Sequence, residues 1–311
     1  MEFLNAVFVA PFVEIFNYPV FFAEVVVGGL LSGIMYSLVA LGFVLIFKAS
    51  GVFNFAQGAM VLFAALTLVG LIEHGMPPWM AIVATVVVMI VLALTVERVV
   101  LRPLVNQEAI ILFMATIGLS YFLDGFGQML WGSDVKTLDL GIPSAPMEYG
   151  GIQVNQFDLI AALVAGALVA VLAVFFQKTR VGRALRAVAD DHQAALSVGI
   201  PLKTIWAIVW SVAGLVGLVA GIMWGTKLGV QFTLALVALK ALPVLILGGF
   251  TSIPGAIIGG LIIGMGEKVA EVFWGPAIGG GIEDWFAYML ALAFLLFRPQ
   301  GLFGDKIIER V

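Results

Sequence analysis

The sequence predicts an all-α, polytopic membrane protein with about eight to nine transmembrane helices. Its 311 residues are 62% hydrophobic and only 11% charged, whereas about a quarter of the residues in a soluble domain are charged. The mean hydropathy is +1.15. Charge-free runs recur that are long enough to cross a bilayer, which takes about 20 residues: 25–47, 75–96, 159–177, 205–226 and 241–266. We expect a single membrane domain over residues 1–311.

Cysteine is absent and few residue patterns suggest chemistry. Without cysteine there is no disulfide or thiolate metal site. The sequence has no GxxxxGK[ST] loop for ATP phosphates, no HExxH and no GxSxG. Neighbouring residues on a helix point about 100° apart, so Asp190, Asp191 and His192 would not converge on one ion. We therefore expect no enzyme, no catalytic residue and no metal site. Glu2 precedes the first apolar stretch without Lys or Arg, so we expect no cleaved signal peptide.

The loops between the apolar runs alternate in the sign of their charge. One set holds 11 of the 15 basic residues, namely Lys48, Arg98, Arg102, Lys178, Arg180, Arg183, Arg186, Lys203, Arg298, Lys306 and Arg310. The other set is acidic and includes a loop at 124–158 and a turn at 267–284. Basic loops remain on the cytoplasmic side. We therefore expect an external N-terminus, a cytoplasmic C-terminus and an odd number of crossings. The crossing at 231–248 is the least certain one, since Lys240 lies inside it.

A charged segment at 179–203 separates two uncharged runs. At 100° per residue, Arg180, Arg183, Arg186 and Asp190 share one face and apolar residues the other, so the pattern predicts an amphipathic helix over 179–198. Gly199 and Pro201 would end it. Three arginines on one face should hold this helix at the cytoplasmic surface. Two interpretations remain open, an interfacial helix on lipid headgroups or a docking element for a cytoplasmic partner.

A second interruption lies at KASGVFNFAQG, residues 48–58. The Ser-Gly pair disfavours a continuous helix, and the amides of Asn54 and Gln57 lie beside Phe53 and Phe55. Broken backbone at membrane depth is tolerated only inside protein or along a wet cavity. This stretch could therefore line a transport pathway, where a restarting helix would present its positive end to a carboxylate. An ordinary cytoplasmic turn explains the same residues.

Three further polar residues lie within apolar runs. Lys240 is a candidate for the pathway, although snorkelling or a partner carboxylate would also explain it. Thr116 and Ser120 are four residues apart and share a helix face. They could stand behind the pathway or bond to carbonyl groups of their own helix.

Glycines spaced by four indicate close helix packing. The pairs are Gly217 with Gly221, Gly255 with Gly259, and Gly260 with Gly264. GGLLSGIM at 28–35 also resembles GGLIIGM at 259–265, a possible trace of an internal repeat.

Five segments carry a family resemblance, in this order: GLLSGIMYSLVALGFVLIF, VFNFAQGAM, GRALRAVADDHQAALSVGI, LKALPVLILGGFTSIPGAIIGGLIIG and RPQGLFG. Together they resemble the LivH-type permease subunits of branched-chain amino acid ABC importers, over most of residues 25–304. The resemblance implies an inner-membrane permease without a cofactor of its own. It would pair with a second homologous permease, two cytoplasmic ATPase subunits that bind ATP-Mg, and an external substrate-binding protein, and would bind no nucleic acid.

The resemblance also assigns the charged segment to ATPase contact. The residues concerned are Gly182, Arg183, Arg186, Asp190, Asp191, His192 and Gly199. Two departures are that Gln57 replaces a frequent His and that Asp191-His192 replaces an acidic-Pro step. Related permeases carry urea, amides and aromatic or organic acids, so the substrate stays open. An ion-coupled carrier is the alternative, disfavoured because we expect every acidic residue at the end of a span.

Overall fold

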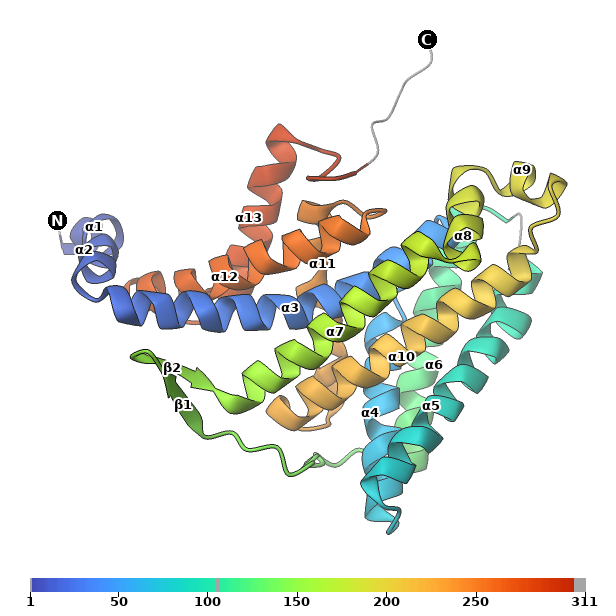
Figure 1. Ribbon diagram of the computed structural model, residues 1–311, viewed down its shortest axis with the longest axis horizontal. Coiled ribbons are helices and arrows are strands. Elements are labelled where there is room, and N and C mark those ends of the chain that lie inside the picture. Colours follow the sequence, from blue (N-terminus) through green and yellow to red (C-terminus); the bar gives the residue numbers. More distant parts are fainter. Residues whose placement is uncertain (1, 105–106, 305–311) are drawn as a thin grey trace. The chain divides into compact units, whose positions relative to one another are not determined.

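The computed structural model describes residues 2–104 and 107–304, and within them it is almost entirely helical (Figure 1). The all-α prediction is confirmed. Five helices are long and apolar enough to cross a membrane: α3 (Pro19–Ser50), α5 (Pro78–Thr95) extended through turns to Leu104, α6 (Ala109–Trp131), α7 (Gln156–Lys178) and α10 (Leu202–Leu228). Lys306 and Arg310 lie outside the described residues.

Four further helices are shorter or bent, and with the bent pair counted as one span up to six spans of the described residues could cross a membrane by length and composition. They are α4 (Gln57–Glu73), α11 (Val237–Gly248), α12 (Ile253–Ile278) and α13 (Glu283–Phe297). A short turn and α11 together are bent by 114° against α12, so they form either one broken span or a re-entrant loop. Pro243 lies inside α11, and Pro cannot donate an intrahelical hydrogen bond. The uncertain crossing at 231–248 is thus a short helix and not a span of its own.

The chain folds into two compact units, each assembled from separate stretches. Of the described residues, the first unit contains 2–37, 141–167 and 240–304, and the second contains 38–104, 107–140 and 168–239. The chain passes from one unit to the other four times: within α3, at residues 140–141 after α6, within α7 and within α11.

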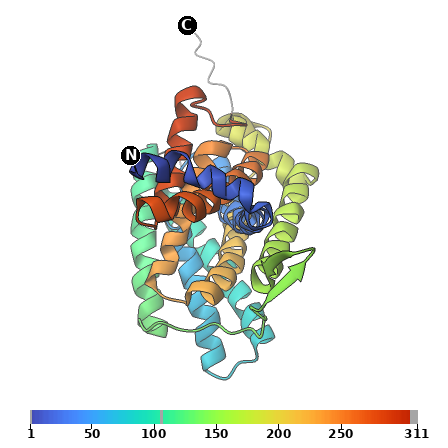
Figure 2. The ribbon, with the colours of Figure 1, turned by 90° about the vertical axis from the view of Figure 1, so that its left-hand side faces the viewer.

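Helix α4 is the core of the second unit. Every residue from Gln57 to Gly70 is buried, as expected for a helix that is apolar on all sides. It packs against α5, α6 and α10 (Figures 1 and 2). At the contact with α10, a β-carbon on Gly221 would come within 2.8 Å of the Val61 carbonyl oxygen, and one on Gly217 would touch the backbone of Met60. Glycine therefore allows these two backbones to approach closely.

Glycines also hold the first unit together. Gly260 and Gly264 of α12 lie directly against Gly33 and Gly29 of α3. The two similar glycine motifs of the sequence are thus packed against each other. Farther along α12, Gly255 and Gly259 lie against the end of α11 at Gly248.

The remainder of the first unit is peripheral to these helices. Helices α1 (Glu2–Phe8) and α2 (Ala10–Asn17) contact α12, where the indole nitrogen of Trp274 donates to the Val7 carbonyl over 3.0 Å. Strands β1 (Pro146–Tyr149) and β2 (Ile152–Asn155) pair in antiparallel fashion (Figure 1).

Two predicted loops are shorter than expected. The loop at 124–158 is reduced because α6 continues through Asp124, whose carboxylate accepts from Gln128 one turn later. At its other end, the side-chain oxygen of Asn155 accepts from the Phe157 amide over 2.9 Å and starts α7. Likewise, α12 continues to Ile278, so the turn expected at 267–284 comprises only the residues between α12 and α13.

We predict that the glycine contact between α3 and α12 can be tested with two neighbouring residues. A β-carbon on Gly29 would come within 2.8 Å of the Gly264 carbonyl oxygen, whereas one on Gly28 meets nothing within 4 Å. Gly29→Leu should lower the free energy of unfolding by about 1–3 kcal/mol through overpacking. Gly28→Leu is the matched control. Equal thermal unfolding midpoints of the two variants in detergent would contradict this packing.

Candidate functional site

The interruption at 48–58 is a break between α3 and α4 inside the second unit. Gly51 has a positive φ of 70°, a conformation that costs glycine little. Asn54 then organises the restart of the helix, because its side-chain oxygen accepts from the Ala56 amide over 3.0 Å. The predicted interruption therefore exists and is stabilised by protein groups.

The amides of Asn54 and Gln57 are completely buried, each with 0% exposure. The Asn54 side-chain nitrogen donates to the Gln57 oxygen over 3.4 Å, and the Gln57 nitrogen donates to the Ala213 carbonyl of α10, also over 3.4 Å. A buried polar group without a partner is costly, and the bond from Gln57 joins α4 to α10. In the conformation described here, both amides bond to protein.

Aromatic rings and Thr116 enclose the same break. The ring centroids of Phe53 and Phe55 are 4.7 Å apart, and Phe55 meets Phe113 of α6 at 4.9 Å. The Thr116 hydroxyl accepts from the Phe55 amide over 3.3 Å and lies within 2.9 Å of the Phe113 carbonyl. The structure thus gathers the predicted residues Phe53 to Gln57 around Thr116. Ser120 follows one turn later and is half-buried, and a pathway role for this group stays a prediction.

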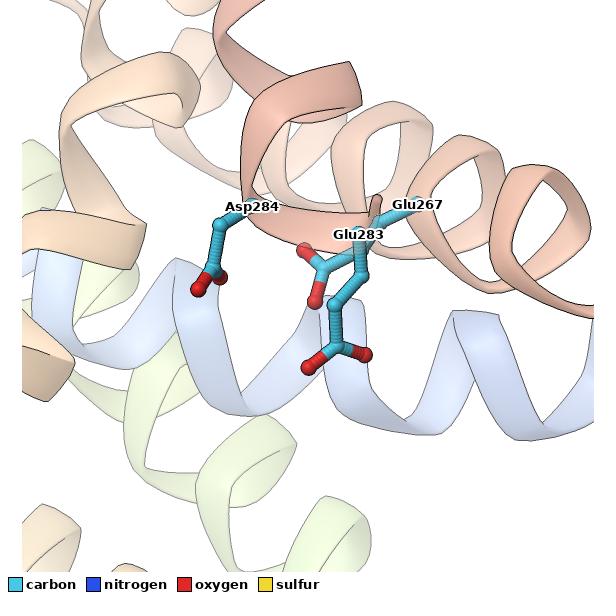
Figure 3. Close-up of side chains that lie close together, drawn as sticks. All are labelled: Glu267, Glu283 and Asp284. Carbon is cyan, nitrogen blue, oxygen red and sulfur yellow. The ribbon is translucent and has the colours of Figure 1, made fainter. Parts of the chain in front are cut away.

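Lys240 belongs to the first unit and sits among three carboxylates. Its ammonium lies 3.1 Å from Glu267, 3.2 Å from Glu283 and 2.8 Å from Asp284. The Tyr36 hydroxyl donates to Glu267 over 3.0 Å. Figure 3 shows Glu267 on α12 turned towards the two residues at the start of α13. A partner carboxylate, one of the three explanations considered for Lys240, is therefore present.

Glu267 corrects the expectation that every acidic residue lies at the end of a span. It is near the middle of α12 and only 4% exposed. A buried carboxylate requires a partner, and Lys240 and Tyr36 supply it. The three carboxylates lie within 4.8 Å of one another, but the lysine ammonium already provides the positive charge between them.

The charged segment forms two helices and not the single one predicted. Helix α8 (Arg180–Asp190) is followed by α9 (His192–Ser197), with Asp191 extended between them. The Asp191 carboxylate accepts from the Ala194 amide over 3.0 Å. Aspartate is a preferred N-cap, so Asp191 starts a new helix. Gly199 has a positive φ of 83° and ends α9, and the side chain of His192 lies outside the described part of the chain.

Helix α8 is fixed to the end of α7. The guanidinium of Arg186 donates to the carbonyl oxygens of Phe176 and Gln177 over 2.8 and 3.3 Å. The Thr179 hydroxyl caps the start of α8 by accepting from Gly182, and Gly182 lies so close to Phe176 that no side chain would fit there. Arg183 and Asp190 are both exposed at the surface of this helix. Arg186 is thus a structural cap, whereas Arg183 is directed to the surroundings.

Sequence reasoning missed several positioning residues. Glu271 accepts from the amides of Gly281, Ile282 and Glu283 and so caps α13. The terminal RPQGLFG segment returns to α11, where Leu302 donates to the Leu247 carbonyl over 2.8 Å. No local pattern predicts these bonds because they join residues far apart in the chain. For the capping of α13, the sequence offered one hint: the acidic residue Glu271 precedes the three glycines at 279–281.

We predict that Lys240→Met destabilises the protein by leaving Glu267 buried without an ammonium. Breaking a buried pair costs roughly 3–5 kcal/mol, and the low end applies because the Lys240 side chain is 25% exposed. Asp284→Asn is the control, since a carboxylate that is 66% exposed contributes at most about 1 kcal/mol. Adding Glu267→Gln to Lys240→Met should restore much of the loss. Thermal unfolding in detergent measures all three, and a Lys240→Met variant as stable as Asp284→Asn would refute the arrangement.

Comparison with known proteins identifies the family of this chain. The family model described as the permease component of the branched-chain amino acid transport system matches residues 25–298. The high-affinity branched-chain amino acid transport system permease protein BraD of Pseudomonas aeruginosa is 30% identical, over 96% of this chain and 99% of its own. LivH of Escherichia coli K12 is 28% identical over 94% and 98%.

Matches of lower sequence identity also cover most of both chains. A probable LivH of Methanocaldococcus jannaschii is 27% identical over 89% of this chain and 91% of its own. The solved structure of PsaBC from Streptococcus pneumoniae in complex with Fab gives a TM-score of 0.49 at 14% identity, covering 87% and 89% of the two chains. The family model and the full-length relatives together place the chain in one class: it belongs to the family of permease components of branched-chain amino acid transport systems.

Proposed function

We propose that this chain is the membrane permease subunit of an ATP-driven importer of branched-chain amino acids. The observation that carries the proposal is the family match over residues 25–298 together with full-length similarity to BraD. The apolar helices supply the membrane-spanning part that such a subunit needs.

ATP would be hydrolysed by other chains. The sequence has no Walker A loop, so the energy must arrive from separate ATPase subunits that bind ATP-Mg. The partners we propose are two such ATPases on the cytoplasmic side, a second homologous permease in the membrane, and a substrate-binding protein outside. The distribution of basic loops supports an external N-terminus and a cytoplasmic C-terminus.

Helix α8 would pass movement from an ATPase to the membrane helices. Its exposed arginine-rich face offers a charged docking surface. Its attachment to α7 through Arg186 means that a push on α8 displaces the end of α7 as well. Alternating access would follow from such displacements, with no covalent chemistry in this chain.

An ion-coupled carrier is the rival class, and Glu267 is the observation that favours it. A buried carboxylate in mid-helix is typical of ion-coupling sites. However, Glu267 is already paired with Lys240 and hydrogen-bonded by Tyr36. We therefore assign it to structure and retain the importer.

Co-purification and the energy source test the proposal. The tagged chain, extracted from its native membrane in mild detergent, should bring with it two Walker-containing ATPases and a second permease. Uptake of L-leucine by the complex should require ATP and be blocked by vanadate. A chain that purifies alone, with uptake abolished by an uncoupler instead, would overturn the proposal in favour of the carrier. Vanadate-sensitive uptake of urea or an organic acid, but not of leucine, would change the substrate only.

We predict that Arg183 and Arg186 separate docking from structure. Arg183→Glu should leave thermal stability unchanged while uncoupling ATP hydrolysis from leucine uptake, because Arg183 is exposed. Arg186→Gln should lower the unfolding midpoint by freeing two α7 carbonyl oxygens. Coupling ratios and unfolding midpoints are measured on both purified complexes. Normal coupling in Arg183→Glu would remove this face from the docking surface.

A further inference from the structure

A cavity of about 240 Å³ opens in the second unit beside the C-terminal ends of two helices. Its floor is formed by Leu62 and Leu66 of α4, which are 1% and 3% exposed. Phe232, just beyond α10, adds an apolar side. The polar part of the lining comes from Gln128 of α6 and from the residues that follow it. The lining is therefore part apolar and part polar, and the part formed by Gln128, Ser133, Asp134 and Gln231 is called its polar end.

The segment that follows α6 contributes Gly132, Ser133 and Asp134 to the lining, and backbone hydrogen bonds hold this polar wall in place. Gly132 and Gly229, directly after α6 and α10, have positive φ angles of 85° and 80° and turn the chain sharply. Beyond these turns, Lys136 and Val230 exchange backbone hydrogen bonds of 3.0 and 2.8 Å. The Lys136 ammonium also pairs with Glu73 at the end of α4. The wall is thus a fixed structure with partners on both neighbouring helices.

The cavity favours a positive charge at its polar end. The C-terminal end of a helix carries a partial negative charge, and both α6 and α10 end beside this wall. Asp134 adds a full negative charge to the lining. Within the described residues, Asp134 forms no ion pair. A primary ammonium would find a carboxylate and a favourable potential here.

The same end offers neutral donors for an anion. Gln128 donates to Asp124 over 3.3 Å and Gln231 to the Leu228 carbonyl over 3.4 Å. Both bonds are long, so each amide can turn towards a ligand at small cost. The hydroxyl of Ser133 lines the cavity as well. These groups can hydrogen-bond a carboxylate without placing a cation beside the ammonium.

We propose that this cavity is a binding site for a zwitterionic α-amino acid with an uncharged aliphatic side chain. Asp134 would hold the ammonium, Gln128, Gln231 and Ser133 the carboxylate, and the Leu62–Leu66 floor the branched side chain. Pockets for drug-sized ligands have volumes of roughly 300–1,000 Å³, so this smaller one suits a single amino acid. The inference rests on the proposed function and assigns a location for the substrate.

The absence of cysteine makes a direct occupancy assay possible. Ser133→Cys places a single thiol in the cavity wall, and Ser144→Cys places one on an exposed residue that does not line it. Both are introduced into the complete complex and labelled with a membrane-impermeant maleimide. L-Leucine should slow labelling at position 133 at least threefold and leave labelling at position 144 unaffected. L-Glutamate should protect neither, because the floor offers nothing to a second carboxylate.

Two further variants locate the ligand. In the Ser133→Cys background, Asp134→Asn should raise the leucine concentration for half-protection about tenfold, the effect of losing one charge-assisted contact. Leu66→Trp should fill the floor and abolish protection. Because Leu66 is buried and the variant could misfold, the exposed Asp134→Asn is the deciding one. Glu148→Gln, an exposed acid outside the cavity, is its control.

The outcomes separate this inference from the proposed function. If the complex takes up leucine but leucine does not slow labelling at position 133, the site assignment fails and the importer stands. The site assignment also fails if the leucine concentration that half-protects position 133 from labelling is the same in Asp134→Asn as in Glu148→Gln. If the complex takes up no leucine and shows no protection, both proposals fail.

Discussion

The need to satisfy every backbone polar group in apolar surroundings governs this structure. In a bilayer, an unpaired N–H or C=O costs several kcal/mol, and helix ends expose four of each. At four breaks within the described residues, specific groups bond to the helix ends. Asn54 accepts from the amide that starts α4, Glu271 caps α13, Arg186 caps α7, and the terminal segment donates to the end of α11. Side chains at several helix ends thus pair with backbone groups that the helices leave open.

This constraint explains which features could be predicted from the sequence. Composition and charge-free runs predict the all-α fold, because burial of apolar surface depends on local hydrophobicity. The interruption at 48–58 and the amphipathic segment at 179–198 were also visible as local patterns. Their details were not, because Asp191 can either continue a helix or cap a new one. Helices α6 and α12 continue past the acidic residues Asp124 and Glu267, which a general rule that acidic residues mark loops overlooks.

The sequence showed that Lys240 is an unusual charged residue in the first unit, but it did not show which residues Lys240 pairs with. Lys240 was visible as an unusual residue, yet Glu267 and Tyr36 come from other helices. Their convergence requires the close approach of α3 and α12, which the glycines at 29, 33, 260 and 264 allow. Small residues and buried charge therefore act together. Glu267 is only 4% exposed beside these closely packed backbones, so its carboxylate needs a partner such as the Lys240 ammonium.

Helix α4 links the two ends of the second unit on which transport would depend. The first turn of α4 is bonded to α10 through Gln57, and the preceding break is enclosed by aromatic rings and Thr116. Leu62 and Leu66, one and two turns later in α4, form the floor of the cavity. Helix α10 follows the α8–α9 segment, contacts α8, and is bonded through Trp206 to the Ala49 carbonyl at the end of α3. A displacement of α8 would reach α10 directly and α4 through Gln57. Because α4 is buried along nearly its whole length, it cannot bend independently of its neighbours. Under the proposed function, movement at its start would reach Leu62 and Leu66 of the cavity, and α8 would be coupled to the proposed substrate site along this route.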